Sequence, residues 1–272
     1  MRHPMLSLAK IIFMDGVRRH ALIGLVVLSL GAEAFGLLFM DFFGRDVGRA
    51  SSDFLFSIMW LAGFMFLFFH AVQSISWDEE HRAIYSILSR PISRAQYVLG
   101  VFIGLAALLL SLQLLLGTVA YATLIAIKGA LDEVYFPALS MAYFGLSWLG
   151  LLLMQFVLLG AILLFSGMVR GGGVVMLLSV AYYGICSGLP VVRASILQHV
   201  SQGEGSSTMA LLLQGLTAIF PDFSRLDFKD FVISDAPITG WAGIGMNITA
   251  SVLYVAIAVT LACVLYARRD LR

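Results

Sequence analysis

The chain has 272 residues and a net charge of +1, and 60% of its residues are hydrophobic while only 12% are charged. Soluble globular domains carry about 25% charged residues, so this composition argues against a soluble enzyme or binding domain. Continuous apolar runs of about 20 residues recur along the chain and predict an all-α protein with several membrane spans rather than a β-barrel. No basic cluster is dense enough to indicate a nucleic-acid partner.

The first 40 residues predict an amphipathic helix followed by a membrane span. Residues 5–19 place apolar side chains on one broad face and polar ones on the other, as in a helix that lies in the membrane interface. The alanines on either side of Glu33 resemble a signal-peptide cleavage site. The apolar run continues through Met40, however, which favours an uncleaved span over residues 20–40.

The apolar runs predict six spans within a single transmembrane domain that covers residues 1–272. We place the spans at residues 20–40, 54–73, 97–127, 139–168, 173–190 and 242–266. Glycines at 171–173 predict a tight turn between the fourth and fifth spans. With both termini in the cytoplasm, 11 of the 17 lysines and arginines face the cytoplasm and 6 face outward. This bias follows the positive-inside rule and therefore favours cytoplasmic termini.

Residues 191–241 form the one long segment outside the predicted spans, on the outer side. Residues 207–220 within it are apolar but too short to cross a bilayer, so they predict a re-entrant or interfacial helix over the outer mouth. A mixed-charge stretch follows, and we expect these charges to be solvated. Its members are Asp222, Arg225, Asp227, Lys229 and Asp230.

A few polar side chains lie inside the predicted spans. They are Glu33, His70, Gln113, Gln155 and Asn247. Ionisable groups at membrane depth are costly and often functional, so Glu33 is a candidate for a transport pathway or for helix pairing. A position facing the outer interface is the alternative for Glu33. We expect the amide side chains of Gln113, Gln155 and Asn247 to form hydrogen bonds between helices. We expect His70 to lie at the membrane interface.

The sequence contains no pattern that indicates catalysis or metal binding. The five histidines lack metal-ligand spacing, and the glycine run at 171–173 lacks the lysine and hydroxyl of a phosphate loop. Cys186 and Cys263 both fall in apolar spans, which argues against a disulfide framework. We therefore expect no catalytic residue, no metal site and no cofactor on this chain, and any ATP would be bound by another chain.

Residues 79–94 (EEHRAIYSILSRPISR) form a charged hairpin between the second and third spans. Glu79 and Glu80 suit the positive end of a short helix. Arg82 and Tyr85 are placed beside its apolar face, where a partner pocket could receive them. That face consists of Ile84, Ile87 and Leu88, and Pro91 and Ser93 then supply a helix stop and a cap for the third span.

The stretch EEHRAIYSILSRPISRAQYVLG resembles the hairpin of type 2 ABC transporter permeases, in which an acidic pair precedes a short helix and a Leu-Ser-x-Pro-x-Ser-Arg segment. The N-terminal AKIIFMDGVRRHALIGL and the C-terminal VLYARRDL resemble the two ends of that family. The sequence pattern of the chain is especially similar to that of permeases of copper-enzyme maturation systems and of multi-subunit exporters. The chain departs from many members at Arg82-Ala83, where they have Gly-Thr, and at Val101, where they have lysine.

The resemblance implies that residues 75–94 form a coupling helix that docks on a separate ATP-binding subunit, which would hold ATP and Mg. The implied contact residues are Glu79, Glu80, Arg82, Ile84, Tyr85 and Ser86, with Pro91 shaping the hairpin and Arg94 anchoring it at the lipid headgroups. It also implies a second permease copy or a related permease, surrounding lipids and an accessory outer subunit. The expected activity is ATP-driven export across a bacterial plasma membrane, with no catalysis by this chain.

Three other classes remain open on the sequence, one of which is a purely structural membrane scaffold. An ion-coupled secondary transporter predicts paired ionisable residues near the membrane midplane and internal repeats, whereas this chain offers only Glu33 and shows no evident repeat. A membrane-embedded enzyme predicts clustered ionisable residues at one depth, which the sequence lacks.

Overall fold

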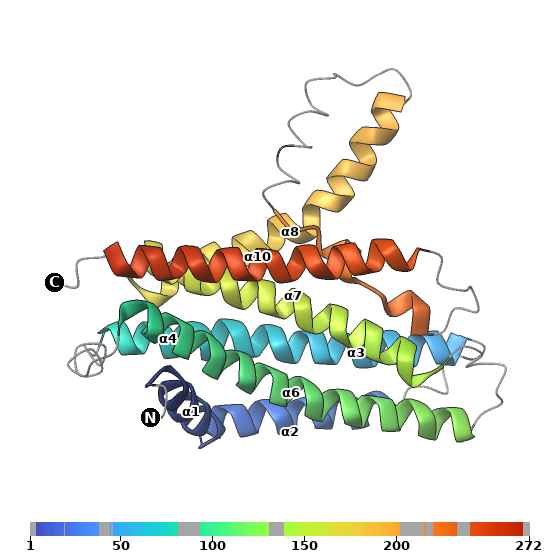
Figure 1. Cartoon of the computed structure of the whole chain (residues 1–272). Helices are drawn as coiled ribbons and strands as arrows, with labels where there is room; N and C mark the ends of the chain where they lie inside the picture. Colours follow the sequence, from blue (N-terminus) through green and yellow to red (C-terminus); the bar gives the residue numbers. More distant parts are fainter. Residues whose placement is uncertain are drawn as a thin grey trace.

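The structure is a computed structural model of the whole chain, and helices account for nearly all of the residues that it describes (Figure 1). The described residues are 4–18, 20–37, 44, 46–80, 93–130, 139–201, 215, 220–232 and 240–268. The long helices are α1 (Pro4–Arg18), α2 (His20–Leu37), α3 (Val47–Met65), α4 (Val72–Glu80), α6 (Arg94–Ala130), α7 (Met141–Met168), α8 (Gly172–Ser201) and α10 (Trp241–Arg268). Three short elements join them, namely the π-helix η2 (Phe66–Ala71) and the 3₁₀ helices η4 (Phe223–Leu226) and η5 (Lys229–Val232).

The chain is an all-α, multi-pass membrane protein. Among the described residues, five helices are long and apolar enough to cross a bilayer. They are Val47–Ser76, Arg94–Ala130, Met141–Met168, Gly172–Ser195 and Trp241–Arg268, the first of which runs through α3, η2 and α4. Helix α2 contains a shorter apolar helix, Leu22–Gly36. A sixth span at α2 therefore stays a prediction.

Both chain termini lie at one end of the helix bundle, which we call the terminus end (Figure 1). Helix α4 ends and helix α6 begins at this same end. The short helices η4 and η5 lie toward the opposite end, which we call the far end. The predicted hairpin is thus attached to the bundle at the end that carries the termini.

Helix α7 lies at the centre of the bundle, and α8 and α10 lie at its surface. In the apolar window of α7, 72% of the residues are buried, against 22% in the windows of α8 and α10. Helix α10 packs mainly on α7. The outward faces of α8 and α10 are therefore available to lipid or to another membrane subunit.

Two glycines on α6 allow α1 to pack closely against it. A Cβ at Gly104 would lie 2.9 Å from Ile12 Cβ and 3.0 Å from the Ala9 carbonyl oxygen, and a Cβ at Gly100 would lie 2.9 Å from a methyl carbon of Leu8. Small residues four apart are a common means of close helix packing in membranes. The helix predicted over residues 5–19 is confirmed, and its position in the membrane interface stays a prediction.

Helix α8 continues past the predicted end of the fifth span. The predicted span covers residues 173–190, and Pro190 lies inside the helix, which runs to Ser201. Proline lacks the N–H for one helical hydrogen bond and clashes with the preceding turn, so a helix that continues through it usually bends. Figure 1 shows the second half of α8 leaving the bundle at an angle. The predicted turn before α8 is present, with Gly171 at φ 100°.

Candidate functional site

The predicted coupling contact falls mostly outside the described residues. Arg82, Ile84, Tyr85, Ser86 and Pro91 lie within residues 81–92, for which the structure gives no placement. The backbone of Glu79 and Glu80 belongs to the last described turn of α4, whose helix starts at Val72. The two glutamates thus continue an existing helix rather than open a new one, and their contact with a partner stays a prediction.

The chain re-enters the bundle after the hairpin through a well-formed helix start at Ser93. The Gln96 backbone N–H donates to Ser93 Oγ at 3.2 Å, and the Ser93 N–H donates to Gln96 Oε1 at 3.0 Å. This reciprocal pair is a capping box, which satisfies two N–H groups at the helix start. The predicted cap at Ser93 is therefore confirmed.

Arg94, the first residue of α6, binds the C-terminal turn of α10. Its guanidinium donates to the Tyr266 carbonyl oxygen at 3.4 Å and to the Ala267 carbonyl oxygen at 3.2 Å. The last carbonyls of a helix lack intrahelical partners and carry the negative end of the helix dipole, so a cation there is stabilising. The structure thus attaches Arg94 to another helix, and the anchor in the headgroups that the resemblance implied stays a prediction.

Tyr266 extends this contact to α7. The Tyr266 side chain is buried, and its hydroxyl lies 2.9 Å from Ser166 Oγ in a buried hydrogen bond. Its ring centroid lies 6.5 Å from that of Tyr97, one turn after Arg94. We call Arg94, Tyr97, Ser166 and Tyr266 the terminus clamp. The clamp joins the start of α6, the end of α7 and the end of α10 at the point where the hairpin meets the bundle.

A buried amide cluster joins α3, α6 and α7 in the middle of the bundle. Gln113 Nε2 donates to the Met59 carbonyl oxygen at 2.8 Å, and Gln155 Nε2 approaches the same oxygen at 3.5 Å. Gly63, one turn after Met59, leaves room for both amides, because a Cβ there would contact them. The prediction that the two glutamines form hydrogen bonds between helices is confirmed.

The second span changes from α-helix to π-helix just after this cluster. Residues Phe66–Ala71 form the π-helix η2, a rare geometry that often occurs at functional sites. His70 lies in it, with its ring centroid 5.2 Å from that of Phe66. Both residues line a groove of about 430 Å³ between this helix and α2. A π-helix has no reliable pattern in a single sequence, so this feature was not predicted.

Glu33 is buried on α2. Only 2% of the residue is exposed, and neither carboxylate oxygen has a hydrogen-bond partner among the residues that the structure describes. One turn later, Gly36 packs against the ring of Phe54 on α3, so α2 and α3 lie close together at this level. A buried polar group without a partner is costly. Both predicted roles for Glu33, in a pathway and in helix pairing, stay predictions.

Residues 220–232 form a compact segment at the far end, which we call the far-end wedge. Ser147 Oγ donates to the Phe228 carbonyl oxygen at 2.7 Å in a buried hydrogen bond. Gly150, one turn further along α7, allows close approach, because a Cβ there would contact the Leu226 carbonyl oxygen. The amide of Asn247 on α10 donates to the Arg225 carbonyl oxygen at 3.4 Å. The wedge thus binds two long helices through its backbone.

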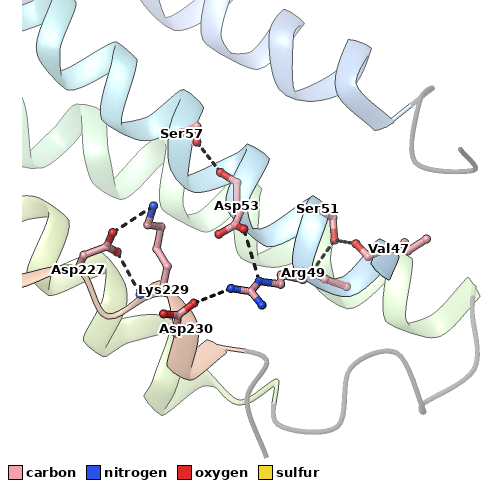
Figure 2. Close-up of polar contacts among 9 residues, drawn as sticks. Val47, Arg49, Ser51, Asp53, Ser57, Asp227, Lys229 and Asp230 are labelled. Atoms are coloured by element: carbon pink, nitrogen blue, oxygen red, sulfur yellow. Dashed lines mark hydrogen bonds and ion pairs between the residues drawn. The ribbon is translucent and has the colours of Figure 1, made fainter. Parts of the chain in front are cut away.

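The wedge has one buried apolar face and one charged face. The buried side chains are Phe223, Leu226, Phe228 and Val232. The charges that we expected to be solvated form ion pairs, of which two lie within the wedge and one crosses to α3. Figure 2 shows the pair Asp227–Lys229 and the pair Arg49–Asp230. The pairs are Asp222–Arg225 at 3.2 Å, Asp227–Lys229 at 3.3 Å and Arg49–Asp230 at 3.2 Å.

No group of three or more His, Cys, Asp or Glu residues that could hold a metal occurs among the described residues. Cys186 and Cys263 are both free thiols. The site residues with the clearest geometry are those of the terminus clamp, the buried amides and the far-end wedge.

Neither a scan against protein-family models nor a search of curated proteins found a match for this chain. The functional argument thus rests on the sequence pattern and on the geometry described above.

Proposed function

We propose that the chain is the membrane-spanning permease subunit of an ATP-driven transporter of the type 2 ABC class, working as an exporter. A separate subunit would bind ATP and Mg and dock on the hairpin of residues 75–94. The observation that carries the proposal is the hairpin sequence itself, held between α4 and α6 at the end of the bundle where both termini lie (Figure 1). In this proposal that end faces the cytoplasm of a bacterial cell and the membrane is its plasma membrane.

The terminus clamp offers a route by which movement of the hairpin reaches the bundle. Residues 93–96 form a capped helix start, so a displacement at Ser93 moves the first turn of α6 as a unit. Arg94 and Tyr97 in that turn contact the end of α10. Closure of the ATP-binding subunits would thus move α6 and α10 together, and α7 with them through Ser166.

A second copy of the chain, or a related permease, completes the proposed transporter, and an accessory outer subunit could bind the far end. Large apolar side chains on α8 and α10 support pairing in the membrane because they are exposed on this copy. They include Leu177, Val252, Leu253, Ile257 and Leu261. Lipid and a second permease could each cover part of these faces.

An ion-coupled secondary transporter is the second candidate, and Glu33 is the observation that favours it. A buried carboxyl without a hydrogen-bond partner is typical of sites that bind a proton or cation during transport. This alternative predicts that Glu33→Gln abolishes transport while leaving any interaction with an ATP-binding subunit unchanged.

Co-purification from native membranes tests the proposal. The tagged chain is extracted in mild detergent, and the proteins that accompany it are identified by mass spectrometry. We expect a soluble protein with a phosphate loop to accompany the chain. The double variant Arg82→Glu, Tyr85→Ala should lose this protein and remain folded, whereas Lys128→Glu, a matched charge reversal at the end of α6, should retain it.

Recovery of the chain without any nucleotide-binding protein, under several extraction conditions, would contradict the proposal. Recovery of such a protein with the hairpin variant as readily as with the natural chain would show that the ATP-binding subunit docks elsewhere. The first result would give priority to Glu33 and to the ion-coupled mechanism, whereas the second would reject only the hairpin as the docking site.

A further inference from the structure

A crevice of about 350 Å³ lies between the far-end wedge and three long helices. Helices α3, α7 and α8 supply its walls, and the wedge covers one side of it. The volume falls in the range of about 300–1,000 Å³ in which small-molecule sites usually lie. The crevice is separate from the hairpin and from the groove beside η2.

The helical wall of the crevice is mainly aromatic and apolar, and it also contains Ser57, Ser147 and Ser187. Trp60 on α3 and Tyr183 on α8 face each other with ring centroids 5.4 Å apart, and the Tyr183 ring lies 6.1 Å from that of Phe223 in the wedge. Leu151 and Met154 on α7 complete the wall. Aromatic rings and a flexible thioether side chain adapt well to an alkyl chain.

The charged lining of the crevice comes from the wedge alone. Asp227 and Lys229 are the two ionic groups among the lining residues. Their side chains are paired at 3.3 Å and remain 44% and 36% exposed, so both can contact a further ligand (Figure 2). The crevice therefore has an apolar wall along the helices and one positive and one negative group at the wedge.

This division matches a molecule with an alkyl chain and a headgroup that carries both charges. Helix α8, which forms one wall, is mostly exposed on the outside of the bundle, so a lipid could reach the crevice from the membrane. Lysine binds phosphate as a point charge.

We propose that the crevice is a specific phospholipid site, with one acyl chain along Trp60 and Tyr183, the lipid phosphate on Lys229 and its ammonium group on Asp227. Phosphatidylethanolamine carries both charged groups in a compact headgroup. The site does not depend on how transport is driven, and it exists whether or not the hairpin binds an ATP-binding subunit.

Fluorescence quenching of Trp60 tests the site in the full-length protein. The chain contains four tryptophans, and Trp77→Phe, Trp148→Phe and Trp241→Phe leave Trp60 as the sole emitter. The detergent-solubilised protein is titrated with phosphatidylethanolamine that carries dibrominated acyl chains. We expect saturable quenching at about one lipid per chain. Lys229→Ala should weaken it about tenfold, the effect of losing one charge-assisted hydrogen bond.

Two controls separate a specific site from general contact with lipid. A protein that retains only Trp148 reports on the interface of α6 and α7, where its indole N–H donates to the Gln113 carbonyl oxygen at 3.0 Å, and it should show no saturable quenching. Ser187→Phe places a ring in the crevice without removing either charge, and it should abolish saturation for Trp60.

Dibrominated diacylglycerol, which has the same chains and no headgroup, distinguishes a phospholipid from any hydrophobic ligand. The proposal expects it to bind at least about tenfold more weakly than the phospholipid. Equal binding of the two lipids would overturn the proposal in favour of a general hydrophobic pocket. Linear quenching that is equal for Trp60 and Trp148, or that Asp227→Asn and Lys229→Ala both leave unchanged, would show that no specific lipid site exists there.

Discussion

The two ends of the bundle are held together by different kinds of contact. At the terminus end, long helices bind one another directly, through Arg94 on the carbonyls of α10 and through α1 against Gly104 of α6. At the far end, a separate short segment fills the space between helices, and the exposed ion pair Arg49–Asp230 joins it to α3. The side chains of this pair are 71% and 83% exposed.

This difference assigns different mechanical roles to the two ends. Exposed ion pairs contribute only about 0–1 kcal/mol, because water and salt screen them. Contacts at helix ends and glycine crossings involve backbone atoms and leave little freedom for independent movement, and the backbone contacts of the wedge with α7 and α10 act in the same way. We infer that the terminus end moves as a unit, and that the far end separates more easily because its charged face can part from α3.

The largest expected effect concerns Gly150. In Gly150→Val, the new side chain would contact the Leu226 carbonyl oxygen, a backbone atom that cannot rotate away. Overpacking of this kind costs about 1–3 kcal/mol, so we expect a clear drop in the midpoint of thermal unfolding in detergent. The control is Gly145→Val in the same helix, where nothing lies within 4 Å of the new Cβ. Equal behaviour of the two variants would show that the wedge does not seat on α7.

The next effect concerns the buried amides. In Gln113→Leu, the hydrogen bond to the Met59 carbonyl oxygen is lost, and we expect a destabilisation of about 1 kcal/mol. Gln155→Leu should cost less, because its contact with the same oxygen is longer, at 3.5 Å. Thermal unfolding of both variants measures the difference. A larger loss for Gln155 than for Gln113 would contradict the assigned roles.

Arg94 is expected to matter more for coupling than for stability. Arg94→Gln removes a cation from the C-terminus of α10, which costs about 0.3–1 kcal/mol. If the clamp transmits movement, the variant should still hydrolyse ATP with its partner subunit but transport less substrate per ATP. The ratio of transport to hydrolysis in reconstituted vesicles measures this, with Arg170→Gln as a matched arginine variant outside the clamp. An unchanged ratio for Arg94→Gln would exclude the clamp from coupling.

The smallest effect is expected for the ion pair across the far end. Asp230→Asn removes the charge that Arg49 binds at 3.2 Å, and the stability should change by less than about 1 kcal/mol. Hydrogen exchange of residues 220–232 should nevertheless become faster, because the wedge is less firmly attached to α3. Glu33→Gln is the comparison, since it alters a buried carboxyl outside the wedge and should leave exchange there unchanged. Slower exchange in Asp230→Asn would refute the proposed weak attachment.

Much of the helical layout followed from the sequence because hydrophobic length is a strong signal in membrane proteins. The predicted spans at 97–127, 139–168 and 242–266 fall close to α6, α7 and α10. Local chemistry also predicted the Ser93 cap and the turn at Gly171. The predicted fifth span, residues 173–190, covers only the first part of α8, because the helix continues through Pro190 to Ser201.

The far-end wedge was not predicted because its structure depends on contacts distant in the sequence. Its charged residues predicted a solvated loop. The neighbouring sequence does not indicate that Phe228 lies against α7, or that Gly150 leaves room for a backbone carbonyl group. The π-helix η2 and the burial of Glu33 likewise depend on how helices pack, which a single sequence does not contain. For the hairpin, in contrast, the sequence suggests a function, and the structure adds no placement of residues 81–92.

The most direct test of the central claim is photo-crosslinking from the hairpin in native membranes. A photoreactive phenylalanine analogue is placed at Tyr85, and the crosslinked proteins are identified by mass spectrometry. We predict one main adduct, with a soluble protein that carries a phosphate loop, and no such adduct from the analogue at Met141, which is 74% exposed at the start of α7. An adduct with lipid alone, or with a protein that binds no nucleotide, would contradict the assignment of the hairpin as a coupling helix.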